Sequence, residues 1–463
     1  MKKTFLSLLI SMGLSTSVFA DDLYQVYQMA VEKDPTINRA KADRDAAFEG
    51  ISLSRANLLP QISGSIGYSD GSRESNQQIS GPTIDNPSLP EVFAIFSQDS
   101  TTLDANLSLG ISIYDHQNWV ALDRAEKVAQ QSDTNYALSK QDLIVRTTDA
   151  YLAILRAKDN LIFVQAEKRA IERQLEQTKQ RFNVGLTAIT DVHEAQANFD
   201  NIVAQEIIAE NVVELRLEEM REITGKYHGN ISVLNTENFS ASGPLPEGVD
   251  NWLKIAEEKN LDLMVRNIAK DIAKEDVSSA KAGHYPTLSL SGRYGRRIDE
   301  ETNNINFGST DSSSIGVTLN VPIYSGGSVL AQTAQARYNF VAASENLELT
   351  YRSTVRSVRS AYNDVIAATS TIRALQQAVV SADSALKATE AGFDVGTRTI
   401  VDVLNSTRSQ FDARRNLAGA RYDFISAILA LKRASGDLTE QYVVDINRGL
   451  MPASSGHFIK MTP

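Results

Sequence analysis

The chain has 463 residues without a single cysteine, and its formal net charge at pH 7 is −11. The absence of cysteine excludes disulfides, thiolate metal sites, cysteine nucleophiles and a lipid-bearing N-terminal cysteine. The negative charge disfavours nucleic acid as a partner and suits an electronegative interior surface.

The first 20 residues have the three regions of a secretory signal peptide. Two lysines follow the initiating methionine, an apolar run begins at Phe5, and Val18-Phe19-Ala20 ends in small residues before Asp21. The mature chain is therefore expected to begin near Asp21, outside the cytoplasm. No later segment has 18 consecutive apolar residues, so a helical membrane span is not expected.

Two helical stretches, at about 22–57 and 249–282, are each followed by a proline and a strand. After Pro60 and after Pro286, apolar residues alternate with small polar ones, which predicts a half-buried strand.

A second alternating segment follows in each half, over 103–113 and 315–323, and ends on Tyr114 or Tyr324. The intervening residues are rich in Ser, Asn, Asp and Gly, and are expected to form the loops between paired strands. These expected loops are residues 69–102 and 295–313.

The four strands have the features of membrane-spanning barrel strands. They are about ten residues long, apolar on one face, and have tyrosines near their ends. A half-buried strand of a soluble sandwich alternates in the same way, so the choice between a membrane barrel and a soluble sandwich depends on the predicted signal peptide. Because about eight strands is the smallest barrel, four strands per chain predict a barrel shared between subunits. Two protomers would supply eight strands and an interior filled by side chains, whereas three would supply twelve strands and room for a pore. The trimer is favoured if the function is passage.

The helical regions are unusually long. From about 118 to 181 there is neither proline nor glycine, which predicts one long helix. Gly185 breaks it, and a second helix is expected from 187 to 223. Apolar residues of the long helix follow 3-4 spacing, which indicates a coiled-coil seam with Lys168 as its polar exception. The seam consists of Ile154, Ala157, Leu161, Val164, Lys168, Ile171, Leu175, Thr178 and Phe182.

The second half of the chain repeats the first. Residues 182–192 return as 393–403, with Phe, Val, Gly, Ile, Asp and Val in the same register. Long helices are again expected, over 328–393 and from the Gly396 turn to Ser435. Such a repeat predicts two equivalent units in a ring.

The expected organisation has five parts. They are a signal peptide (1–20), a first repeat (21–225), an irregular equatorial segment (226–248), a second repeat (249–436) and a C-terminal equatorial segment with a tail (437–463). The predicted fold class is mainly α with a membrane β-barrel: a trimeric twelve-stranded barrel that continues into a long α-helical barrel.

Catalytic and cofactor motifs are absent from the sequence. It has no P-loop, Gly-x-Ser-x-Gly or His-Glu-x-x-His motif, and its five histidines lack ligand spacing. We therefore expect no enzyme activity, no cofactor and no metal site. The alternative class is a trimeric cell-surface coiled-coil adhesin or structural protein, which would carry its coiled coil as an external stalk.

The order helix, strand, loop, strand, long helix, Val-Gly turn and helix, repeated once, resembles the TolC family of outer-membrane channel-tunnels. The resemblance extends from the start of the mature chain to about residue 436. It is carried by residues 42–49, 181–186, 188–192, 338–341 and 395–404.

The resemblance implies a function and partners. Members of the family are trimers in the outer membrane of Gram-negative bacteria, and their helical tunnel is closed at the periplasmic end. They are passive exit ducts for tripartite multidrug efflux pumps and type I protein secretion. The implied partners are a periplasmic adaptor (membrane fusion) protein, an inner-membrane RND, MFS or ABC transporter, and outer-membrane lipid. Drugs, detergents or secreted proteins would pass through.

The resemblance also bears on the acidic residues at the helix ends. The residues alone favour Asp191 and Asp402 as complements to the positive N-terminal ends of their helices. The resemblance instead places Asp402 on the selectivity ring of the tunnel entrance. Asn405 stands where the family has a second acidic ring, so this entrance should bind cations less strongly.

Further positions match the family's gate. Arg398 matches an arginine that ties the mobile inner hairpin to the outer one, with Thr190 and Asp191 as its partners. Phe393 stands where the family has a tyrosine that makes a second link, and it lacks the hydroxyl. Release of the links would let the inner hairpin uncoil, as in an iris. The implied adaptor-docking turns, which also terminate helices, are Val184, Gly185, Leu186, Val395, Gly396 and Thr397.

Overall fold

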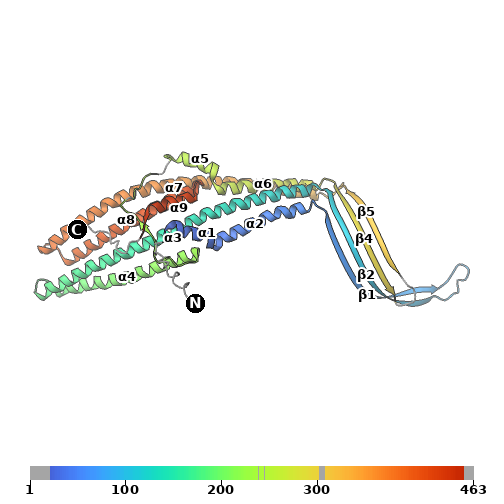
Figure 1. Cartoon of the computed structure of the whole chain (residues 1–463), viewed down its shortest axis with the longest axis horizontal. Coiled ribbons are helices and arrows are strands. Elements are labelled where there is room, and N and C mark those ends of the chain that lie inside the picture. Colours follow the sequence, from blue (N-terminus) through green and yellow to red (C-terminus); the bar gives the residue numbers. More distant parts are fainter. Residues whose placement is uncertain (1–20, 238, 244–245, 302–307, 453–463) are drawn as a thin grey trace, which may run out of the picture. The chain divides into compact units, whose positions relative to one another are not determined.

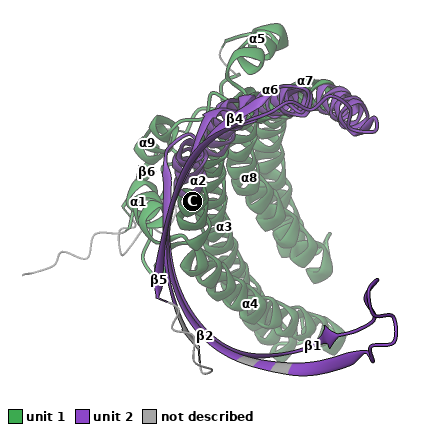
Figure 2. Ribbon diagram, turned by 90° about the vertical axis from the view of Figure 1, so that its right-hand side faces the viewer, with its two compact units in different colours: residues 1–43, 133–266, 347–463 green, residues 44–132, 267–346 purple. Residues whose placement is uncertain are grey.

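The computed structural model describes residues 21–237, 239–243, 246–301 and 308–452. The predicted signal peptide (1–20) and the end of the predicted tail (453–463) lie outside the described residues. Figure 2 shows the two compact units of the chain, each of which takes residues from both sequence halves. Unit 1 comprises Met1–Asp43, Asp133–Arg266 and Leu347–Pro463, and unit 2 comprises Arg44–Ser132 and Asn267–Asn346.

Unit 2 contains a four-stranded antiparallel sheet in the order β1-β2-β4-β5 (Figure 1). The strands are β1 (Gln61–Ser80), β2 (Val92–Tyr114), β4 (Thr287–Glu301) and β5 (Ser309–Asn320). The predicted starts after Pro60 and Pro286 and the predicted end at Tyr114 are confirmed.

The strand register places the apolar residues on one face of the sheet. Ile62 pairs with Leu109, Leu109 with Gly292, and Gly292 with Ile315. All twelve residues of β5 are exposed, and Ile66 and Ile315 keep about 80% of their surface (82% and 78%). A soluble sandwich would bury these side chains. The described residues of unit 2 therefore leave the apolar face of the sheet uncovered.

The predicted loops 69–102 and 295–313 are wrong over much of their length. β1 continues to Ser80 and pairs with β2 from Val92 onward, and β4 and β5 extend to Glu301 and Ser309. These extensions are largely polar, so they lack the alternation that marks a strand, and backbone hydrogen bonds hold them together. β5 ends at Asn320 rather than at Tyr324, because Pro322 has no N–H to donate to the ladder.

The helical stretches predicted at 22–57 and 249–282 are each broken in two. The first forms α1 (Leu23–Lys33) and α2 (Pro35–Ala56), and the second forms α5 (Val249–Lys259) and α6 (Leu261–Ala282).

The breaks fall at two buried residues with extended backbone, Asp34 and Asn260. Each side chain accepts a hydrogen bond from a backbone N–H of the next helix, Asp34 from Thr36 at 2.6 Å and Asn260 from Leu263 at 3.0 Å. These bonds satisfy donors at the start of the second helix. Pro35 adds a steric reason, because a proline disfavours helical backbone in the preceding residue.

The long helices match the predictions to within about two residues at most ends. They are α3 (His116–Asn183), α4 (Ile189–Thr224), α7 (Ser328–Asp394) and α8 (Ile400–Ser435). The hairpin turns contain Gly185 (φ 80°) and Gly396 (φ 79°), in the left-handed region that glycine adopts without strain. In unit 1, the predicted seam of α3 packs its buried apolar residues against α4, and Lys168 pairs with Glu206 at 2.6 Å.

The equatorial segments are more regular than predicted. Residues 437–452 contain α9 (Glu440–Arg448) and β6 (Leu450–Met451), and β6 pairs with β3 (Val233–Leu234). Ile231, Leu234, Leu438 and Val443 join the core that α1, α3 and α4 form. Among the described residues, no helix is both long enough and apolar enough to cross a membrane.

Candidate functional site: the turn end of the helical hairpins

The two hairpin turns carry exposed apolar side chains. Val184, Leu186 and Val395 retain 70%, 70% and 77% of their accessible surface. The backbone bonds around the turns are equivalent, since Leu186 N–H donates to Arg181 O and Thr397 N–H donates to Gly392 O. These bonds close a Schellman-type end on α3 and on α7. The turns thus fix the helix ends while leaving apolar side chains available for contact.

Asp402 lies in the first turn of α8 and forms a capping box with Thr399. Its Oδ2 accepts hydrogen bonds from the Thr399 N–H (2.9 Å) and Oγ1 (3.0 Å), and its own N–H donates to Thr399 Oγ1. These bonds lower the pKa of Asp402, the backbone bond most, so the carboxylate is ionised at neutral pH. The helix-end role favoured by the residues alone is therefore present, and Oδ1 has no hydrogen-bond partner among the described residues.

Asn405 follows Asp402 by one helical turn, on the same face of α8, and is exposed. The corresponding helix start in the first half of the chain, the N-terminus of α4, is capped differently. The N-cap of α4 is Ala188, which has no side-chain oxygen, and Asp191 accepts a hydrogen bond from Thr187 Oγ1 instead. The two repeats therefore place an aspartate in the first turn with different local partners.

The predicted gate link is not formed within one chain. Among the described residues, no hydrogen bond or ion pair joins Arg398 to Thr190 or Asp191. Arg398 lies against α7 instead, where its N–H donates to Gly392 O at 3.2 Å. A Cβ placed on Gly392 would come within 2.7 Å of Arg398 Cγ, so the stem of this arginine covers the glycine.

A row of polar contacts joins α3 to α8 and was missed from the sequence. We call it the α3–α8 ladder. Its contacts are Asp142–Arg433 (2.9 Å), Asp149–Ser426 (3.0 Å), Asp159–Tyr422 (2.6 Å), Glu167–Arg415 (3.0 Å) and Gln174–Thr407 (3.0 Å). The signal in the sequence was the recurrence of polar residues seven apart, at 142 and 149 and again at 167 and 174.

The ladder differs from the contacts inside each hairpin. α3 packs on α4 through Val164, Ile171 and Leu175, and α7 packs on α8 through residues such as Val365 and Phe424. Burial raises the pKa of the Asp159 and Glu167 carboxyls, and Tyr422 and Arg415 oppose the rise. The two hairpins are thus joined by this row of polar contacts in addition to apolar clusters shared between them, such as the one formed by Phe163 of α3 with Phe411 and Ala418 of α8.

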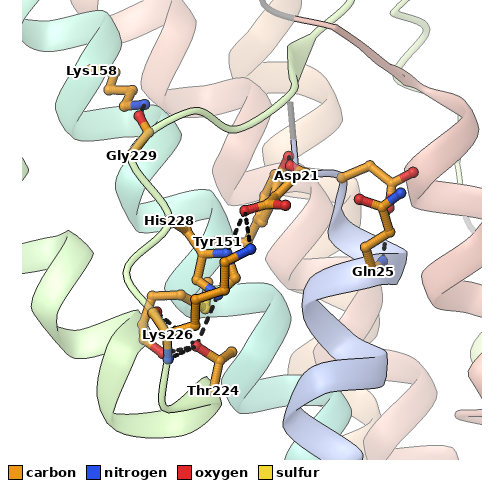
Figure 3. Close-up of polar contacts among 10 residues, drawn as sticks. Asp21, Gln25, Tyr151, Lys158, Thr224, Lys226, His228 and Gly229 are labelled. Atoms are coloured by element: carbon orange, nitrogen blue, oxygen red, sulfur yellow. Dashed lines mark hydrogen bonds and ion pairs between the residues drawn. The ribbon is translucent and has the colours of Figure 1, made fainter. Parts of the chain in front are cut away.

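A second polar cluster fastens the start of the described chain (Figure 3). His228, which is fully buried, contacts Asp21 Oδ2 through Nδ1 at 2.8 Å and Thr224 Oγ1 through Nε2 at 2.9 Å. Tyr151 donates a hydrogen bond to Ser232 O at 2.8 Å. The order Asp, His and hydroxyl is that of a hydrolase triad. Here the hydroxyl is buried beside backbone carbonyls of residues 220 and 226, so the cluster ties the 226–232 loop to the chain start.

Comparison with solved structures gives the class of fold. A membrane protein from Pseudomonas aeruginosa superposes with a TM-score of 0.73 and 19% identity, over 91% of this chain and 94% of that one. The outer membrane protein VceC from Vibrio cholerae gives a TM-score of 0.68 and 19% identity, over 89% and 96%. The chain therefore has the fold of these bacterial membrane proteins.

Sequence comparison identifies the family. The profile of the family Outer membrane efflux protein matches residues 26–226 and 252–437. The chain is 44% identical to outer membrane protein TolC of Vibrio cholerae over 97% of this chain and 99% of that protein. Identity to TolC of Escherichia coli is 41%, over 95% and 88%. Alkaline protease secretion protein AprF of Pseudomonas aeruginosa is 28% identical, over 92% and 87%. The chain belongs to the outer membrane efflux protein family, and it is a protein of the Gram-negative outer membrane.

Proposed function

We propose that three copies of this chain form a passive exit duct across the outer membrane, for multidrug efflux and type I protein secretion. The observation that carries the proposal is the sheet of unit 2. Within the described part of unit 2 its apolar face is uncovered, and the edge strands β1 and β5 each have one side that pairs with no described strand. Unpaired backbone groups are costly in lipid, so such a sheet needs closure by further copies. Three sheets would give a twelve-stranded barrel.

The division into two repeats (21–225 and 249–436) and two equatorial segments (226–248 and 437–463) belongs to this proposal. Each repeat supplies two strands and one long hairpin, so three chains would supply six equivalent units. Strands and hairpins interleaved in this way do not favour the alternative of an external adhesin stalk.

The names of relatives support the cargo and the partners. The family is named for efflux, and AprF is named for protease secretion. We infer that drugs, detergents or secreted proteins pass through the duct. An inner-membrane RND, MFS or ABC transporter would supply the energy, and a periplasmic adaptor would connect it to the exposed turns at Val184–Leu186 and Val395–Thr397. Docking would cover the apolar side chains of these turns.

We further propose that the turn end is a gate. Arg398 would reach Thr190 and Asp191 of a neighbouring copy, since no such bond forms among the residues described in a single chain. Asp402 would form a ring of three carboxylates at the entrance, with Asn405 beside it, and the free Oδ1 of each Asp402 would face passing cations.

The test combines assembly and conductance. Cross-linking in detergent should give a trimer, and the trimer should conduct in planar bilayers. A stable, functional monomer would overturn the architecture. Arg398→Ser should raise the single-channel conductance, as should Asp191→Ala. The matched control is Arg352→Ser, which removes an exposed arginine of α7 whose ion pair is with Glu348 on the same helix. Unchanged conductance in both gate variants would mean that Arg398 and Asp191 are ordinary surface residues without a role in gating.

A further inference from the structure

The last turn of α3 carries an arginine that reaches the other hairpin. The guanidinium carbon of Arg181 lies 4.4 Å from the ring centroid of Phe393, within the range of a cation–π interaction. Arg181 Nη1 is also 3.8 Å from Asp394 Oδ1. Both partners are in the last turn of α7. One side chain therefore joins the ends of the α3/α4 hairpin and the α7/α8 hairpin.

The surroundings of this contact make it specific. Phe393 packs against the apolar cluster that contains Leu175, Leu386 and Ile400, so its ring is held in place. The Arg181 side chain is only 25% exposed, whereas Asp394 is 68% exposed. The partly desolvated contact with the ring should therefore dominate, because the exposed carboxylate is screened by solvent.

The position of Arg181 continues the spacing of the α3–α8 ladder. Glu167, Gln174 and Arg181 are seven residues apart, and each contacts the other hairpin. Arg181 is the contact nearest the turns. A contact at this end resists separation of the two hairpins at the place where that separation would be largest.

We infer that Arg181 is a latch that holds the turn end closed by clamping Phe393, with Asp394 as a secondary partner. This inference rests on the proposed gate and adds to it a residue outside the Arg398 link. It also assigns a role to Phe393 that needs an aromatic ring and no hydroxyl. Spreading of the hairpins would expose the ring and separate the cation from it.

Single-channel conductance of the trimer tests the latch. Arg181→Met keeps the aliphatic stem and removes the charge, and we expect at least a twofold rise in conductance. Phe393→Leu should give a similar rise, whereas Phe393→Tyr should give no rise because the ring remains. Arg173→Met is the matched control, because Arg173 is an exposed arginine of the same helix, and it should have no effect.

The combination of variants separates a latch from a general loosening. Arg181→Met together with Phe393→Leu should give no greater conductance than either change alone, because both remove one contact. Additive rises would overturn the latch, as would wild-type conductance in an assembled Arg181→Met trimer. If wild type conducts and Arg398→Ser opens it while Arg181→Met does not, only the latch fails. If wild type does not conduct, the proposed duct itself fails.

A distance measurement supports the same test without relying on conductance. The chain has no cysteine, so Gln180→Cys and Lys387→Cys, both at exposed positions, can carry the only two spin labels per chain. The label-to-label distance distribution should broaden toward longer distances in the Arg181→Met background and stay unchanged with Arg173→Met. An unchanged distribution in both backgrounds would contradict the latch.

Discussion

Arg415 pairs with the carboxylate of Glu167, a nearly fully buried member of the α3–α8 ladder. Glu167 is 2% exposed and its Oε2 lies 3.0 Å from Arg415 Nη1. At an effective dielectric constant of 20, two unit charges at this distance attract by about 5.5 kcal/mol, which offsets the cost of desolvating them. Arg415→Met leaves the carboxylate buried without its partner. We expect the free energy of unfolding to fall by about 3 to 5 kcal/mol per chain at pH 7.

The loss should depend on pH in a defined direction. Burial raises the pKa of Glu167, and Arg415 opposes that rise, so removing Arg415 raises the pKa further. A carboxyl whose pKa is higher in the folded than in the unfolded state destabilises the fold when it is ionised. The penalty disappears as the pH falls through the folded-state pKa and the group takes up a proton. The variant should therefore lie closer to wild type at pH 5 than at pH 8.

Thermal or urea unfolding in detergent, followed by circular dichroism at 222 nm, would measure the effect. The double variant Glu167→Gln with Arg415→Met removes both charges and should recover most of the loss. Arg352→Met is the control, since its pair with Glu348 is exposed and contributes about 0.5 kcal/mol or less. A loss below about 1 kcal/mol for Arg415→Met, with no dependence on pH, would refute this account of the ladder.

Three further predictions concern the entrance, the helix ends and the equatorial loop. Asp402→Ala should abolish most of the cation preference and most of the block by multivalent cations, and Asn405→Asp should strengthen the block. Reversal potentials and blocker affinities in bilayers measure both effects. If Asn405→Asp leaves the blocker affinity unchanged at low salt, position 405 does not face the pore. Gly396→Ala should lower the free energy of unfolding by about 1 to 2 kcal/mol, because alanine is strained in the left-handed region. Gly436→Ala should lower it clearly more, because the added Cβ would lie 2.3 Å from Lys259 O. Equal losses in thermal unfolding would contradict the clash at Gly436. His228→Phe should lower the free energy of unfolding by about 1 to 3 kcal/mol, since Asp21 and Thr224 lose a buried hydrogen-bond partner. It should also speed hydrogen exchange of the backbone amides in residues 226–232. Unchanged exchange would mean that other contacts hold this loop.

The sequence by itself determined the local elements and the family. Proline and glycine act on the backbone beside them, so the strand starts after Pro60 and Pro286 and the turns at Gly185 and Gly396 were readable without a structure. Apolar periodicity marks the face of a helix that packs, so most of the predicted seam of α3 proved buried. These signals are short-range, and they required no knowledge of which segments meet.

Only the tertiary structure decided which side chains meet. Arg415 and Glu167 are 248 residues apart in sequence, and Arg181 and Phe393 come from different hairpins. Such pairs depend on the register between packed helices, which no local pattern records. The polar ends of β1 and β2 became strand for a similar reason, because pairing of two backbones across the sheet replaced the missing apolar alternation.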